Sequence, residues 1–139
     1  MKDNFVKLKK INSALMFHEV GASCPSGFYT ETRYRYVISE TEFQHLIDLS
    51  VKISNKYNIL FDYTFDDGGL SNLSSAEYLS KKGLRGLFFI PTQFIGKEGF
   101  LSKNDIIMLK NDGHEIGSHS HSHPMFLNQL NYEKQQIEW

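Results

Sequence analysis

The chain has 139 residues, 40% hydrophobic and 14% aromatic, which is enough to build one domain with a buried core and excludes an intrinsically disordered chain. Its formal net charge is −1, and its densest basic stretch, residues 7–10, is too short for a nucleic-acid-binding surface. Cys24 is the only cysteine, which excludes an intrachain disulfide and a zinc site built from thiolates.

The N-terminus lacks the apolar stretch of a signal peptide, and no segment has the apolar length needed to cross a bilayer. A lone cysteine also fits a reducing compartment. We therefore expect a cytoplasmic protein that binds neither nucleic acid nor membrane.

The first predicted elements are a strand, a longer excursion and a helix. Residues 14–18 form an apolar run that predicts a buried strand, and residues 33–37 alternate at strand period within the excursion over 21–38. Ser39 followed by Glu42 is a capping-box pattern that predicts the start of a helix. Apolar residues at helical spacing support this helix: Phe43, Leu46, Ile47 and Val51.

The rest of the chain alternates between apolar strands and capped helices. Further strands are predicted over residues 59–65, 86–90 and 114–117. The helices are predicted to begin at Ser71 or Ser74, at Ser102 and at Asn131, and glycines Gly83 and Gly113 end the first two.

This order predicts an α/β fold with about four βα units. The strands are continuously apolar, which indicates parallel pairing with both faces buried. We expect a single domain over residues 1–139. The last helix runs to Trp139 without a stop signal, and four parallel strands leave open edges, so we expect the N-terminal portion of a larger barrel.

Two adjacent carboxylates, Asp66 and Asp67, follow the strand over 59–65 and precede two glycines. Neighbouring strand residues point to opposite faces, so both side chains can share one site only where the strand becomes a loop. A calcium loop beginning at Asp62 is excluded, because Asp67 and Leu73 occupy the positions of its glycine and glutamate. An Asp-Gly surface turn is the alternative, which the preceding core strand disfavours.

The second polar cluster consists of alternating histidines, His119, His121 and His123, after the strand over 114–117. All three could chelate a metal, or the tract is a polar loop without one. One aspartate with two histidines suits zinc or a similar divalent ion that keeps an open position for water.

His18 also follows a strand, and the sequence leaves it between a packing residue at the strand end and a substrate-facing role. It is not part of a zincin helix, and neither is His114, because each lacks a second histidine at the required spacing.

Several of these segments resemble the polysaccharide deacetylase family, which is carbohydrate esterase family 4 or the chitooligosaccharide deacetylase homology domain. Thr64-Phe-Asp-Asp-Gly68 is similar to its first motif, and His119-Ser-His-Ser-His123 is similar to its second. The flanking segments agree in the right order, and they are residues 17–19, 87–90, 94–96 and 113–117. The resemblance covers about residues 14–139.

The resemblance implies a deformed (β/α) barrel. It also implies that Asp66 is the catalytic base and that Asp67, His119 and His123 bind a divalent metal ion, zinc first, with cobalt or manganese as alternatives. The position of His121 varies in the family, so it stays outside the ligand set. The general acid, the arginine that holds the base and the acetyl-methyl pocket belong to late motifs, expected beyond Trp139.

The implied function is a metal-dependent hydrolase that removes N-acetyl groups from amino sugars of a polysaccharide or oligosaccharide. The implied partner is an N-acetylated glycan substrate, and without the late motifs we expect this chain to be feeble or inactive alone. One alternative is a catalytically inactive remnant that binds metal or carbohydrate. Another is that a second copy or a completing chain covers the open edges.

Overall fold

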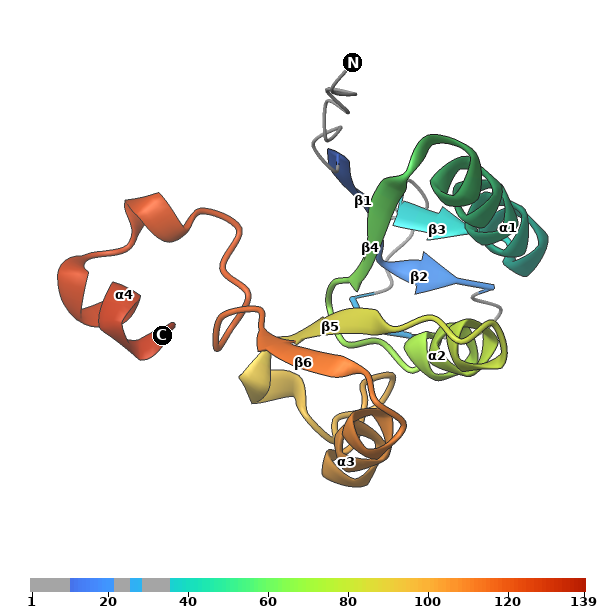
Figure 1. Cartoon of the computed structure of the whole chain (residues 1–139). Helices are drawn as coiled ribbons and strands as arrows, with labels where there is room; N and C mark the ends of the chain where they lie inside the picture. The colour runs from blue at the N-terminus through green and yellow to red at the C-terminus, as the bar shows by residue number, and fades with distance from the viewer. Residues whose placement is uncertain (1–10, 22–25, 29–35) are drawn as a thin grey trace, which may run out of the picture.

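The computed structural model describes residues 11–21, 26–28 and 36–139 (Figure 1). Its elements, in which η marks a short 3-10 helix, follow in this order: β1 (Ile11–Phe17), β2 (Glu19–Val20), β3 (Val37–Ile38), α1 (Glu40–Tyr57), β4 (Ile59–Phe65), α2 (Asn72–Lys81), β5 (Gly86–Ile90), η2 (Thr92–Phe94), α3 (Lys103–Asn111), β6 (Glu115–Ser118), η3 (Leu127–Gln129) and α4 (Tyr132–Ile137). The strand expected over 33–37 lies mostly outside the described residues, and only Val37 falls within β3.

The main sheet has four parallel strands in the order β1-β4-β5-β6, and β2 and β3 form a small parallel pair. The predicted α/β class with parallel strands is confirmed. β4 and β5 have their predicted bounds, whereas β1 begins earlier than expected because Ile11 pairs with Ile59 at the start of β4. Figure 1 shows α4 apart from the other helices, beyond the carboxyl end of β6.

The core lies between the sheet and the helices α1 to α3. Aromatic side chains from adjacent strands line it, with the ring of Phe65 5.4 Å from Phe17 and 4.7 Å from Phe88. Phe43 of α1 and Leu79 of α2 close this layer and are almost inaccessible to water. Each such buried side chain contributes roughly 1.5–3 kcal/mol to folding.

The opposite face of the sheet is less covered than the sequence predicts. Met16 of β1 is 62% exposed and Leu60 of β4 is 42% exposed. Both point away from the core, because side chains alternate across a strand. Burial on both faces is therefore wrong for these positions, since α1, α2 and α3 pack on the face that carries Phe65.

The predicted helix starts are present, with one difference at α2. Ser39 and Glu42 form the capping box of α1, with the Glu42 amide donating to Ser39 Oγ at 3.2 Å. Ser102 and Asp105 form a second capping box on α3, and on α4 the Asn131 side chain accepts the Lys134 amide at 3.0 Å. Ser71 occupies the N-cap position of α2, but its hydroxyl donates elsewhere, to a Glu19 carboxylate oxygen at 2.6 Å.

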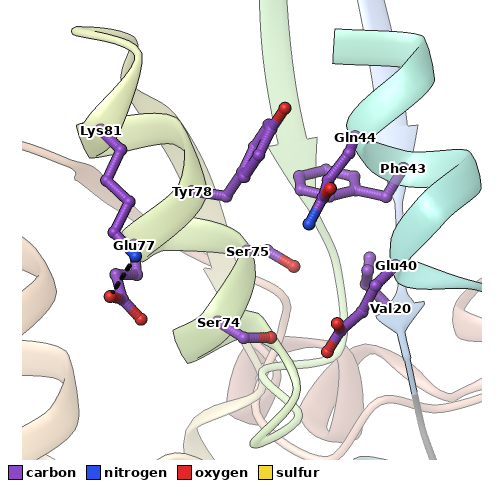
Figure 2. Close-up of a pocket in the computed structure, with 9 residues that line it drawn as sticks. All are labelled: Val20, Glu40, Phe43, Gln44, Ser74, Ser75, Glu77, Tyr78 and Lys81. Carbon is purple, nitrogen blue, oxygen red and sulfur yellow. Dashed lines mark ion pairs between the residues drawn. The ribbon is translucent and has the colours of Figure 1, made fainter. Parts of the chain in front are cut away.

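A cavity of about 210 Å³ lies between α1 and α2 (Figure 2). Phe43 and Val20 contribute apolar surface to it, and a Glu77–Lys81 ion pair of 2.6 Å lies on its α2 side. The described residues that line it include no cluster of metal-ligating side chains. Among the described helices, none combines the length and apolarity required to span a lipid bilayer.

Candidate metal centre

Parallel pairing brings the carboxyl ends of β1, β4, β5 and β6 to one edge of the sheet, where α/β folds place their chemistry. The Asp66 amide donates to the Phe17 carbonyl at 2.9 Å, and the His119 amide donates to the Ile90 carbonyl at 3.0 Å. Each bond continues a strand pairing by one residue. The backbone of both candidate motifs is therefore held by the sheet itself.

The strand period breaks at Asp67, which has a φ of 72°. Gly68 follows with a φ of 63°, and a Cβ there would lie 3.2 Å from the Ile90 side chain. A left-handed conformation is uncommon for a residue with a side chain and occurs often at functional sites. Because of this turn, the neighbouring carboxylates no longer alternate between the two faces of the sheet as strand residues do.

Asp67, His119 and His123 form a compact cluster at this edge. Asp67 Oδ1 lies 3.5 Å from His119 Nε2 and 3.2 Å from His123 Nε2. One ligand atom from each of the three residues lies within 4.8 Å of the others. His121 lies outside the cluster, because its Nδ1 pairs with Thr92 Oγ1 at 2.8 Å.

The donor set fits a divalent cation. Asp67 is 7% exposed, and its Oδ1 has no hydrogen-bond partner among the described residues. Leaving a buried acceptor unsatisfied costs about 1–3 kcal/mol. One carboxylate oxygen and two imidazole nitrogens that converge on one point can instead share a zinc-like ion, with a further position left for water.

The charges of the cluster are mutually dependent. Burial favours the neutral form of Asp67, but the His119 and His123 imidazoles outweigh burial and hold the pKa of this carboxyl below its ordinary value. The Asp67 carboxylate in turn raises the pKa of His119. An ionised carboxylate is also the form that binds a metal.

The other aspartate faces a different imidazole. Asp66 Oδ2 lies 4.0 Å from His18 Nε2, and both side chains are mostly buried. The His18 ring also packs on Tyr36, with 4.8 Å between ring centroids. The sequence left His18 between packing and a substrate-facing role, and the structure places it beside Asp66, where both uses of the ring are compatible.

Sequence analysis missed Glu19, which lies buried behind the turn. It is 5% exposed, it accepts the Ser71 hydroxyl at 2.6 Å, and burial raises the pKa of its carboxyl. A Cβ on Gly69, the second glycine after the aspartates, would displace Glu19 Oε1 from its present position. Residues 17–19 are among the segments that resemble the family, and that resemblance is the signal that could have identified Glu19.

The family model described as polysaccharide deacetylase matches residues 60–139, which is more than half of the chain. No curated protein sequence matches it.

Solved structures share the fold. The deacetylase PplD of Streptococcus pyogenes, solved with acetate, has a TM-score of 0.70 at 17% identity, covering 94% of this chain and 64% of its own. IcaB from Ammonifex degensii has a TM-score of 0.69 at 23% identity, covering 93% of this chain and 64% of its own. A polysaccharide deacetylase from Bacillus cereus has a TM-score of 0.67 at 22% identity, covering 88% of this chain and 43% of its own. The chain thus spans less than two thirds of these proteins, and its parallel α/β structure matches part of their deformed barrel fold.

Proposed function

The chain belongs to the polysaccharide deacetylase family, and from this premise we propose that it is a metal-dependent hydrolase acting on N-acetyl groups of amino sugars in a polysaccharide or oligosaccharide. The observation that carries the proposal is the buried Asp67 Oδ1, which has no hydrogen-bond partner among the described residues and faces His119 and His123. A buried carboxylate oxygen without a hydrogen-bond partner is stabilised more by a bound cation than by a water molecule.

Asp67, His119 and His123 would hold the cation, and their donor atoms suit zinc first, with cobalt and manganese also compatible. When bound, such an ion supplies Lewis-acid polarisation of a carbonyl and acidifies a water molecule. The protein supplies the geometry, because the sheet fixes the backbone of Asp66 at the end of β4 and that of His119 at the end of β6.

Asp66 is the residue that we assign as general base. It precedes a ligand in the chain, and its own carboxylate is directed to His18 rather than into the ligand cluster. From there it can accept the proton of the water that attacks the acetamide carbonyl. General bases in this role contribute about 10²–10⁴-fold to the rate.

His18 is the candidate that the described residues offer as general acid. Breaking the amide C–N bond releases an amine, whose nitrogen must gain a proton while the acetyl carbon gains the hydroxyl. A protonated His18 imidazole, 4.0 Å from the base, could provide that proton. Sequence analysis placed the acid beyond Trp139, and the geometry supports this second candidate.

The alternative is a chain that binds metal or carbohydrate without turnover. It is supported by the exposed apolar side chains on the open face of the sheet, such as Met16 and Leu60, and by the partial coverage of the similar structures. In the same way, a second copy or a completing chain could cover this face.

The deciding experiment measures zinc binding and acetate release together. The purified chain is titrated with zinc by calorimetry and then incubated with N-acetylglucosamine oligomers. Stoichiometric zinc binding with acetate release supports the hydrolase, and zinc binding without release supports the alternative. If the chain binds no zinc, the proposed metal ligands are wrong, and only the carbohydrate-binding form of the alternative remains.

A further inference from the structure

Glu138 is a buried carboxylate that contacts the loop between the histidines of the cluster. It is 6% exposed, although it lies just after α4. Its Oε2 accepts the amides of His121 at 3.0 Å and Ser122 at 2.7 Å, and its Oε1 accepts the Ser122 hydroxyl at 2.6 Å. The loop between His119 and His123 is therefore bonded to a residue far along the chain.

This loop has a backbone that needs support. Ser120 has a φ of 62° and His123 has a φ of 54°, both in the left-handed region that residues with side chains rarely adopt. Such conformations cost of order 1–3 kcal/mol each and persist where surrounding contacts determine them. A flexible tract of alternating histidines would not by itself keep both imidazoles turned toward Asp67.

Hydrogen bonds hold the loop between His119 and His123 from two sides, and Glu138 provides those on one side. On one side, the amides of Thr92 and Gln93 donate to the carbonyls of Ser120 and His121, at 3.2 and 3.0 Å. On the other side, the carboxylate of Glu138 satisfies amides of the same loop. The loop is thus held between the chain after β5 and the end of α4.

We propose that Glu138 is a positioning residue for the metal centre, which keeps the loop that carries His119 and His123 in the geometry that binds the ion. The inference rests on the proposed metal-binding function and extends it to α4, a helix that contributes no ligand. Figure 1 shows how the chain after β6 runs outward to α4 and then returns. Docking of α4 and formation of the metal site are therefore linked.

This position requires a side chain that reaches the loop and accepts several hydrogen bonds at once, as the Glu138 carboxylate does. Glutamine has the same shape, and its carbonyl oxygen could accept both amides while its NH2 group donates to Ser122 Oγ. Alanine removes all of these contacts.

The test compares three substitutions at Glu138 with one control in the whole chain. Zinc affinity is measured by calorimetry in competition with a chelator, well below the thermal midpoint of each metal-free variant. Glu138→Ala should weaken zinc binding by about 10–100-fold, the range found for residues that support metal ligands indirectly. Glu138→Gln should stay close to the unaltered protein, and Glu138→Asp, one methylene shorter, should lie between.

Glu133→Ala is the matched control, because Glu133 is an exposed glutamate on α4 and its loss changes the net charge equally. It should leave zinc affinity unchanged. The visible absorption of the cobalt-substituted protein gives a second measurement, which reports ligand geometry rather than folding. It should change in Glu138→Ala and be restored in Glu138→Gln.

The outcomes separate this inference from the proposal on which it rests. Wild-type zinc affinity and an unchanged cobalt spectrum in Glu138→Ala would overturn the positioning role while leaving the metal site intact. If Glu138→Ala does not fold, Glu138→Asp decides by the same two measurements. If the unaltered chain itself binds no zinc, the metal site is overturned, and this inference with it.

Discussion

His123 Nε2 lies 3.2 Å from Asp67 Oδ1, although the two residues belong to motifs well separated in the chain. Asp67 follows β4 and His123 lies beyond β6, and these two strands are not neighbours in the sheet. Left-handed backbone at both residues directs their side chains to one point. The cluster is therefore a product of sheet order and local turns together.

Replacing either Asp67 or His119 with alanine should abolish stoichiometric zinc uptake. Each change removes one of three donors, and the remaining two cannot hold the ion against water. Metal content after dialysis, measured by atomic emission, checks this. His121→Ala is the control, because that imidazole contacts Thr92 instead, and equal loss of zinc in His121→Ala would show that the ligand set is wrong.

Asp66→Asn should keep zinc and lose acetate release. The amide cannot accept a proton from water, whereas the ligand cluster does not include this side chain. The expected fall in rate is about 10²–10⁴-fold, typical of a missing general base. Acetate release and zinc content are measured on the same sample. A variant that releases acetate normally would remove Asp66 from the mechanism.

His18→Phe should lower acetate release by a similar factor of about 10²–10⁴ while zinc binding is retained. Phenylalanine preserves the ring packing on Tyr36 but cannot transfer a proton to the leaving amine. His45→Ala, at an exposed position of α1, serves as the control and should release acetate at the unaltered rate. Normal activity of His18→Phe would place the acid elsewhere.

Glu19→Gln should alter how the thermal midpoint depends on pH. Burial raises the pKa of Glu19 above its ordinary value of 4.5, so between these two values the folded protein holds this proton and the unfolded chain does not. The free energy of unfolding contributed by Glu19 is thus greatest below pH 4.5 and falls as the pH rises through the folded-state pKa. A glutamine at this position does not titrate, so its contribution to the free energy of unfolding does not fall as the pH rises.

The midpoint of Glu19→Gln relative to the unaltered protein should therefore increase as the pH rises above 4.5. The scans include a chelator, so that metal binding does not contribute. Glutamine can still accept the Ser71 hydroxyl, which keeps the network around the turn. A difference that stays constant with pH would mean that Glu19 is not destabilised by burial.

Local patterns predicted most of the elements. The apolar run over 59–65 and the glycine-bounded run over 86–90 match β4 and β5, since continuous apolar strands are specified by composition alone. The capping boxes at Ser39 and Ser102 are likewise local, because each bond joins residues three apart. Ser71 is the exception, since its hydroxyl bonds to Glu19 rather than to its own helix.

The fold class, the helix starts and the residue types at the strand ends could all be predicted from local sequence patterns, because these features depend on neighbours within a few positions. Which of these residues meet depends on how the strands and loops pack. The tertiary structure placed His121 on Thr92 and His18 beside Asp66, and it buried Glu19 and Glu138. Those outcomes depend on contacts between distant segments, for which a local pattern carries no information.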